Sequence, residues 1–215
     1  GIDIDGYSIK KFEEKDPSAI DWKSAGVDIV IESTGLFTAR EAAAGHLQGG
    51  AKKVIISGPS GDADAMICMG INDEIYDAKS MDIISNASCT TNCLSPMAKV
   101  LDDAFGIESG FMTTVHAYTS DQQVQDMAVA SRSGKKDIRR MRAANLSIIP
   151  NSTGAAKAIG QVLPKLDGKL SGMSLRVPTP VGSITDLTVQ VKKDVSVEEV
   201  NAAFEKAAND KSYRS

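Results

Sequence analysis

Short apolar runs alternate with helix-type patterns in the first part of the chain. Runs of strand length occupy residues 28–34, 53–57 and 82–85. Buried strands that alternate with helices are typical of a parallel α/β sheet. The first of these runs ends in a Ser-Thr-Gly turn that contains Thr34, and the second ends at Ser57. We therefore expect a parallel sheet in this part of the chain.

Helix signals follow two of these strands. Thr38, with Glu41 three residues later, predicts a capping box, and the paired glycines at 49–50 predict the end of that helix. The strand at 82–85 runs into SNASCTTNC, and apolar residues then recur at the spacing of a helix. These residues are Leu94, Met97, Leu101 and Phe105.

The pattern changes in the second half. Residues 110–118, 170–177 and 183–191 predict strands, and the last alternates apolar and polar positions, which is typical of a half-solvated antiparallel sheet. Residues 119–149 between them predict irregular structure. Ser196 with Glu199 predicts a second capping box, which opens a final helix. We place a domain boundary near Cys89, with a nucleotide-type α/β part before it and an α+β part after it.

Composition narrows the class of protein. The 215 residues are 42% hydrophobic and 24% charged, as in ordinary soluble domains, and the formal net charge of −4 argues against nucleic-acid binding. The apolar runs are far shorter than the ~20 residues of a membrane-spanning helix. Three cysteines make no disulfide framework, so we expect a reducing, cytoplasmic environment. The chain begins at Gly1 and stops after a helix pattern, and we interpret it as a fragment.

Cys89 is the strongest candidate for chemistry. It follows a predicted strand and opens a predicted helix, where backbone N–H groups and the helix dipole favour a thiolate. A buried structural cysteine is the alternative. Cys93, one turn further on, is expected in the core, and Cys68 in a buried strand. A metal site at Cys89 and Cys93 is poorly supported, because the chain has only two histidines and no second cysteine pair; we expect no metal.

His116 is the candidate partner of this thiol. It lies inside the predicted strand MTTVHAY, where most histidines are core or surface residues without chemistry. As a functional residue it would take the proton from the thiol, because pairing with histidine is the usual way to activate a cysteine. Sequence spacing alone does not show that the two side chains meet.

Two further segments are candidate anion sites. Ser152, Thr153 and Gly154 come just before a predicted helix, and such hydroxyls and N–H groups suit a phosphate, although an ordinary helix cap is the alternative. Arg176 lies at the end of a strand, where it is either a surface charge or a phosphate ligand. The basic segment at 132–142 is more typical of a solvated loop, or of a loop that pairs with another subunit, than of a nucleic-acid patch.

Four segments carry a family resemblance, and they occur in the order SNASCTTNC (85–93), TTVHAYT (113–119), STGAAKAIG (152–160) and LRVPTP (175–180). Together they resemble the phosphorylating glyceraldehyde-3-phosphate dehydrogenases, and the similarity extends over essentially the whole chain. The resemblance implies a Rossmann-type NAD-binding part over residues 1–88 and an α+β catalytic domain with a largely antiparallel sheet over residues 89–215, incomplete at its C-terminus. It also implies an NAD-dependent enzyme of glycolysis that acts as a homotetramer, with no nucleic-acid or membrane partner.

The resemblance also implies a role for individual residues. Cys89 is the nucleophile that forms a thioester, and His116 is its base. The C3 phosphate of glyceraldehyde 3-phosphate would be held by Thr119 and Arg176, with Asp121 nearby. The remaining matches are inorganic phosphate ligands, namely Ser88, Thr90, Thr153 and Gly154, and residues along the adenosine side of NAD, namely Thr34 and Ser57.

The chain departs from the family pattern in several places. The N-terminal glycine turn, the acidic residue that holds the adenosine ribose and the C-terminal asparagine near the nicotinamide match nothing here. Ser120 stands where asparagine is usual, and Asn151 where threonine is common. A longer loop at 127–136 replaces a segment that normally faces a neighbouring cofactor, which leaves the choice between NAD and NADP open.

Three alternative functions remain from the sequence. Erythrose-4-phosphate dehydrogenase shares the cysteine and histidine motifs and differs in its aldehyde. An inactive binding module would keep the fold without the cofactor turn. A cysteine hydrolase would use the same Cys89 and His116 and would release an acid without forming NADH.

Overall fold

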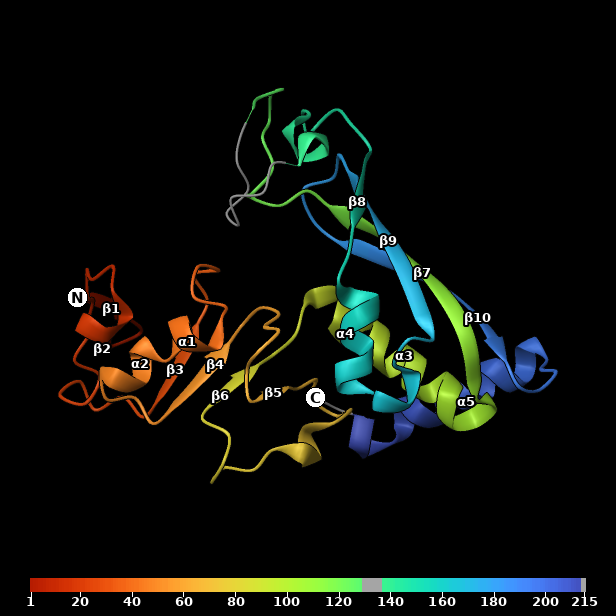
Figure 1. Cartoon of the computed structure of the whole chain (residues 1–215), viewed down its shortest axis with the longest axis horizontal. Helices are drawn as coiled ribbons and strands as arrows, with labels where there is room; N and C mark the ends of the chain where they lie inside the picture. Colours follow the sequence, from red (N-terminus) through yellow and green to blue (C-terminus); the bar gives the residue numbers. More distant parts are fainter. Residues whose placement is uncertain (129–136, 214–215) are drawn as a thin grey trace. The chain divides into compact units, whose positions relative to one another are not determined.

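The chain folds into two compact units. The computed structural model describes residues 1–128 and 137–213. Residues 1–66 and 76–86 form the first unit, and residues 67–75 and 87–215 form the second (Figure 1). Segment 67–75 therefore leaves the first unit and joins the second before the chain returns to finish the first sheet. Cys68 lies in this segment; it is buried, as expected, but it follows a strand instead of lying in one.

A parallel sheet of four short strands is the frame of the first unit. Its spatial order is β3 (Ile29–Glu32), β4 (Lys53–Ile56), β6 (Ile83–Ser85) and β5 (Ala65–Met66). All three pairings are parallel, so the carboxyl ends of the strands share one edge. This confirms the predicted α/β part.

The helical segment after β3 starts differently from the prediction. It consists of two single-turn helices, α1 (Arg40–Ala43) and α2 (Gly45–Gln48), which end at Gly49 as expected. The predicted capping box at Thr38 is wrong, because the residue before α1 is Ala39 and makes no side-chain cap. The carboxylate of Asp62 accepts the Arg40 N–H at 2.9 Å instead, so a residue distant in sequence caps this helix.

The apolar core of the first unit lies between these helices and the sheet. Its fully buried members are Ala43, Val54, Ile56 and Ile83. A buried aliphatic side chain of this size contributes ~1.5–3 kcal/mol. The alternate positions of β3, Ile29 and Ile31, are 56% and 66% exposed, so this strand buries only one of its two faces.

A hairpin that the sequence analysis did not assign opens the chain. Strands β1 (Ile2–Ile4) and β2 (Tyr7–Ile9) pair antiparallel across Asp5 and Gly6. Both turn residues have positive φ, 49° and 82°, which is the conformation that an Asp-Gly hairpin turn needs. A 3-10 turn, η1 (Pro17–Ala19), follows and is capped by Asp16.

The second unit is built on a mixed sheet. Its spatial order is β10 (Ser183–Val191), β7 (Ile107–Ala117), β9 (Leu170–Val177) and β8 (Ile149–Ser152). The two outer pairings are antiparallel, as predicted, whereas the central pair β7 and β9 is parallel. Strand β10 exposes every second residue, in agreement with its alternating sequence.

Three helices complete this unit. Helix α3 (Cys89–Phe105) and helix α4 (Ala155–Val162) pack together beside the sheet, and α5 (Val197–Asn209) packs on α3 (Figure 1). The capping box of α5 at Ser196 and Glu199 is confirmed. Their shared core includes Leu94, Leu101, Ile107, Met112, Ile159 and Leu166.

Short 3-10 turns join these elements. They are η2 (Asp73–Ile75), η3 (Ile138–Met141), η4 (Pro164–Leu166) and η5 (Lys211–Tyr213). The stretch that the sequence predicts to be irregular therefore contains η3. Part of that stretch, residues 129–136, lies outside the described residues.

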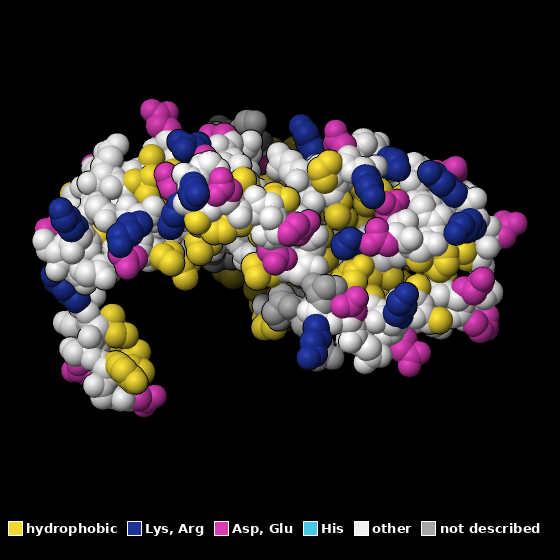
Figure 2. All heavy atoms as spheres, turned by 90° about the horizontal axis from the view of Figure 1, so that it is seen from below, with side chains coloured by type: hydrophobic (Ala, Val, Ile, Leu, Met, Phe, Trp, Pro, Cys, Tyr) yellow, Lys and Arg dark blue, Asp and Glu magenta, His cyan; other side chains and the backbone are white. Residues whose placement is uncertain are grey.

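The surface carries charges of both signs. On the face drawn in Figure 2, lysine and arginine side chains are interspersed with aspartate and glutamate, and hydrophobic side chains show between them. Within the described ranges, no helix has the combination of length and apolar character that crossing a bilayer requires.

Candidate active site

Cys89 is the first residue of helix α3, as the sequence predicts. Its thiol is exposed, and Ser88 caps the helix by accepting the Thr91 N–H at 3.0 Å. Ala87, just before the cap, has a φ of 59°, which is unusual for a residue with a Cβ and costs about 1 kcal/mol. The chain thus makes a strained turn that presents the thiol at the positive end of the helix dipole.

His116 lies beside this thiol. The Sγ atom of Cys89 is 3.4 Å from Nε2 of His116, within reach of a hydrogen bond to sulfur. The other ring nitrogen, Nδ1, is 2.7 Å from the carbonyl oxygen of Ala117. In the tautomer that donates Nδ1–H to this carbonyl, Nε2 of the neutral ring is left to accept the thiol proton. The geometry is that of an activated cysteine.

Strand pairing brings Arg176 to the same place. His116 on β7 and Arg176 on β9 are direct partners in the parallel register. One guanidinium nitrogen, NH1, donates to the Ala117 carbonyl at 3.0 Å and to the hydroxyl of Thr119 at 3.1 Å. The same nitrogen lies 3.0 Å from Nδ1 of His116, a close contact between two donors.

The guanidinium of Arg176 is partly removed from water. Desolvation lowers the pKa of its guanidinium, and the nearby charge of Arg140 lowers this pKa further. Its Nε is buried and has no hydrogen-bond partner among the described residues. A half-buried cation with an unused, buried donor is stabilised by an anionic ligand, and the planar guanidinium fits a phosphate.

Asp121 and Thr119 complete this group. Burial opposes ionisation of Asp121, but the Thr119 hydroxyl donates to it and Arg140 pairs with it, so its pKa lies below the ordinary value. Two arginines and one aspartate leave a net positive charge around Thr119, which suits a phosphate ester. Sequence reasoning missed Arg140, because it is one of several basic residues in the segment at 132–142 and nothing in the sequence distinguishes it from the others.

Two other arginines of the basic segment pair within the chain. Arg139 bonds Asp137 at 2.9 Å, and Arg142 bonds Asp126 at 3.1 Å. Residues 132–136 of this segment, and most of the loop at 127–136, lie outside the described residues.

A cavity of about 480 Å³ opens over Cys89 and His116. Cys93 lines it one helical turn from Cys89 and is exposed, so its predicted place in the core is wrong. Residues four apart on a helix share a face, and this face is turned to the cavity. Sequence reasoning also missed several residues that line the cavity, namely Thr114, Tyr118, Pro180, Val181 and Ser183.

The second predicted anion site lies further along the sheet. Thr153 and Gly154 follow β8, and the Thr153 hydroxyl accepts the Ala155 N–H at 3.2 Å at the start of α4. The register pairs Ile149 with Arg176 and Ser152 with Met173. Thr153 lies one residue beyond Ser152, so four residues of extended chain, ~13 Å, separate it from the position opposite Arg176.

The other two predicted phosphate ligands lie on α3. The Ser88 hydroxyl is engaged in capping and also lies 2.7 Å from the Thr91 hydroxyl. Thr90 is 8% exposed and lines the same cavity as Cys89.

The predicted cofactor residues lie at the carboxyl edge of the first unit's sheet. Thr34 follows β3, and Ser57 follows β4 and is exposed. Around Gly58, next to Ser57, a Cβ would have no atom within 4 Å, so the backbone is open to a ligand. Ligands of open α/β sheets bind at this edge, so these residues fit a dinucleotide.

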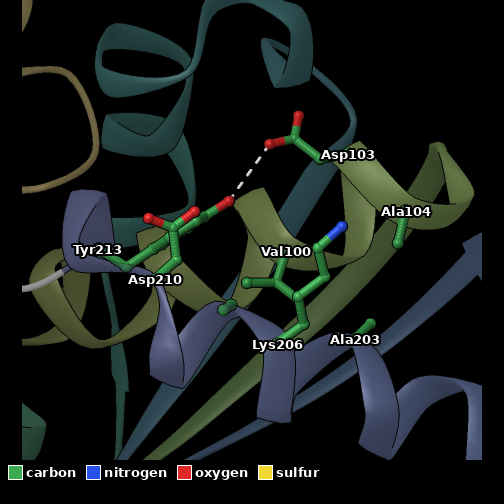
Figure 3. Close-up of a pocket in the computed structure, with 8 residues that line it drawn as sticks. Val100, Asp103, Ala104, Ala203, Lys206, Asp210 and Tyr213 are labelled. Carbon is green, nitrogen blue, oxygen red and sulfur yellow. Dashed lines mark hydrogen bonds between the residues drawn. The ribbon is translucent and has the colours of Figure 1, made fainter.

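A second hollow lies between α3, α5 and η5 and contains none of the predicted residues (Figure 3). Its volume is about 240 Å³, and the Tyr213 hydroxyl within it points to Asp103 at 3.4 Å. Over the described part of the chain, no three histidine, cysteine or acidic side chains are grouped as metal ligands.

Two family profiles match the chain. The family profile described as glyceraldehyde 3-phosphate dehydrogenase, C-terminal domain, matches residues 88–214. The profile described as glyceraldehyde 3-phosphate dehydrogenase, NAD binding domain, matches residues 1–40.

Curated relatives cover most of the chain. The glyceraldehyde-3-phosphate dehydrogenase of Streptomyces coelicolor is 56% identical over 209 residues, which are 97% of this chain and 60% of that protein. That of Mycobacterium tuberculosis is 61% identical over 192 residues, 89% of this chain and 55% of that protein. That of Mycolicibacterium smegmatis is 58% identical over 208 residues, 96% of this chain and 59% of that protein. The chain therefore spans somewhat more than half the length of these relatives.

The thiol is paired with a histidine at a helix start, a half-buried arginine lies on the neighbouring strand, and a family profile matches more than half of the residues. The chain belongs to the glyceraldehyde 3-phosphate dehydrogenase family.

Proposed function

We propose that the protein oxidises glyceraldehyde 3-phosphate with NAD and inorganic phosphate to 1,3-bisphosphoglycerate, through a thioester on Cys89. The observation that carries this proposal is the contact of 3.4 Å between Cys89 and His116, with Arg176 beside the same histidine. Residues 1–88 are the part that serves NAD, and residues 89–215 are the catalytic domain. The relatives named above are triose-phosphate enzymes, so the comparisons do not favour the tetrose alternative.

His116 and Cys89 share the first chemical step. The imidazole Nε2 takes the thiol proton, and the thiolate attacks the aldehyde carbon. The proton on Nε2 then passes to the aldehyde oxygen, which completes the thiohemiacetal and leaves Nε2 free to accept again. The same nitrogen then receives the proton of the substrate hydroxyl as the thioester forms. NAD, when bound, accepts the hydride in this oxidation. A thiolate suits both halves of the reaction, because it is a strong nucleophile and a good leaving group.

Two anion sites hold the two phosphates. Arg176 and Thr119 bind the C3 phosphate of the aldehyde, and Asp121 and Arg140 fix the position of Thr119. Thr153 and Gly154, with Ser88 and Thr90, receive the inorganic phosphate that attacks the thioester. The separation of ~13 Å along the direction of β8 leaves room for a three-carbon substrate between the two groups.

Thr34 and Ser57 serve the adenosine side of NAD. Support comes from their place at the carboxyl edge of the parallel sheet and from the open backbone beside Ser57. The protein works as a cytoplasmic homotetramer in this proposal. Three free cysteines agree with a reducing compartment.

The test is formation of NADH by the full-length protein. We expect NADH only when NAD, glyceraldehyde 3-phosphate and inorganic phosphate are all present, and much slower turnover with erythrose 4-phosphate. Release of an acid without NADH would point to a hydrolase and would contradict the proposal. Absence of turnover in a protein that binds NAD would favour the binding module.

Thr153→Ala separates the two anion sites. Loss of one neutral hydrogen bond should weaken the dependence on inorganic phosphate by ~1 kcal/mol, about 5-fold in KM for phosphate. The KM for the aldehyde should stay within about 2-fold of the wild-type value. The measurement is steady-state kinetics with each substrate varied in turn. Equal losses for both substrates would mean that Thr153 does not belong to a separate site.

A further inference from the structure

A buried chain of hydrogen bonds crosses the first unit from Trp22 to Thr34. The indole Nε1–H of Trp22 donates to Nδ1 of His46 at 3.2 Å, and Nε2 of His46 lies 2.9 Å from Glu32. The other oxygen of Glu32 accepts the Thr34 N–H at 2.8 Å and the Thr34 hydroxyl at 2.5 Å. His46 and Glu32 are only 6% and 3% exposed, so water contributes little to this network.

The pattern of donors determines the protonation of each member. An indole N–H only donates, so Nδ1 of His46 must accept, and the ring proton is on Nε2. Nε2 therefore donates to Glu32. Glu32 receives three donated hydrogen bonds in total, which requires a carboxylate. Burial opposes that charge, but the bonds from Thr34 and His46 keep the pKa of Glu32 below its usual value.

Trp22 is held firmly at the far end of the chain of bonds. Its backbone N–H donates to the Gly49 carbonyl at 2.9 Å, just after helix α2. At Gly49 a Cβ would lie 2.3 Å from the Ile20 carbonyl oxygen, so only glycine permits this close approach. The indole that contacts His46 therefore belongs to a residue whose backbone is held against Gly49.

Thr34 lies at the end that faces the cofactor edge. Its hydroxyl gives its proton to Glu32 and accepts the Leu36 N–H at 3.1 Å, which closes the turn after β3. The proton of this hydroxyl is therefore used inside the protein. The turn can therefore present its backbone to a ligand, and the hydrogen bonds from Thr34 to Glu32 hold that backbone in one conformation.

We propose that Glu32 and His46 are positioning residues for NAD, which hold the turn at residues 33–36 in the conformation that receives the cofactor, while Trp22 sets the tautomer of His46. This inference rests on the proposed function, because it takes NAD as the ligand of that edge. In Figure 1 the elements concerned, β3 and α2, belong to the same unit, and no residue of the chain of bonds lies in the other.

Glu32→Gln is the first test, in the full-length protein. The amide N–H₂ of the new side chain would face Nε2 of His46, so that two donors would meet. If the proton of His46 moved to Nδ1, Nδ1 would face the indole N–H of Trp22, and two donors would meet there instead. We expect the Kd for NAD, measured by isothermal titration, to rise about 10-fold. The kcat at saturating NAD should change by less than about 2-fold, because the catalytic residues lie in the other unit.

Rescue by a second change distinguishes positioning from general damage. Trp22→Phe removes the conflicting donor, so the double variant Glu32→Gln with Trp22→Phe should bind NAD better than Glu32→Gln alone. His46→Gln keeps one donor and one acceptor and should bind within about 3-fold of wild type, whereas His46→Leu should lose about 10-fold. If Glu32→Gln does not fold, the difference in Kd for NAD between His46→Gln and His46→Leu tests the inference by itself.

Lys53→Met is the matched control for stability. Lys53 bonds Asp82 and two carbonyls at the amino end of β4, the edge opposite to Thr34. Its loss should lower the melting temperature of the first unit without changing the Kd for NAD. An unchanged Kd in Glu32→Gln, or additive losses in the double variant, would overturn the inference. Failure of the wild-type protein to bind NAD would instead overturn the proposed function, and the inference with it.

Discussion

Cys89→Ser should abolish NADH formation, with kcat lower by about 10⁴-fold or more. A serine hydroxyl at this place keeps the shape of the helix start, but it ionises far less readily than a thiol and leaves less easily as an ester. The variant should still bind NAD, because Cys89 lies outside the unit that is proposed to serve the cofactor. Absorbance of NADH in the steady state and titration with NAD are the two measurements.

Cys93→Ser is the matched control. Both cysteines are exposed on one face of α3, so burial does not protect Cys93 from reagents. Only Cys89 has the histidine contact, at 3.4 Å, and the helix N-terminus. Iodoacetamide should therefore modify Cys89 first, and Cys93→Ser should keep most of its activity. Peptide mapping that finds Cys93 labelled first would refute the assignment of the nucleophile.

Arg176→Ala should raise the KM for glyceraldehyde 3-phosphate by roughly 30- to 5,000-fold, which corresponds to ~2–5 kcal/mol of lost binding. The large effect follows from the partial burial of the guanidinium, which reduces the screening of its charge by water. It also follows from Asp121, which would lose one of the two arginines that balance it. The measurement is kinetics with the aldehyde varied at saturating phosphate and NAD.

Two controls accompany this variant. Glyceraldehyde without a phosphate should react equally slowly with wild type and with Arg176→Ala, because neither can use the missing group. Arg142→Ala removes an exposed arginine from the basic segment, where it pairs with Asp126, and should leave the KM unchanged. A similar rise in KM for both arginine variants would mean a diffuse charge effect and no specific phosphate site.

Local patterns predicted most elements well. The strands at 170–177 and 183–191 match β9 and β10, because their apolar and β-branched residues form uninterrupted or alternating runs between turn residues. The capping box at Ser196 was predictable because both of its members lie within one turn. At Thr38 the same type of signal misled, since Asp62, more than twenty residues away, caps the helix instead.

The site was less accessible to sequence reasoning than the fold. Cys93 was expected in the core because it follows Cys89 by one turn, but four residues along a helix return to the same face. Arg140 gave no distinctive signal, because its role depends on a partner, Asp121, that lies 19 residues earlier in the same connection between β7 and β8. The parallel pairing of β7 with β9 was equally hidden, since strand order across a sheet is a property of the packed structure.

The register of β7 and β9 has a consequence for how this protein can change. His116 and Arg176 lie beside each other only because the two strands pair residue for residue from Gly110 with Leu170 onwards. One residue inserted into or deleted from β9 would turn every later side chain to the opposite face of the sheet. Natural variation in chain length should therefore be absent between residues 170 and 176. In the connection between β7 and β8, Thr119, Asp121 and Arg140 belong to the proposed phosphate site, so insertions and deletions there should avoid these residues.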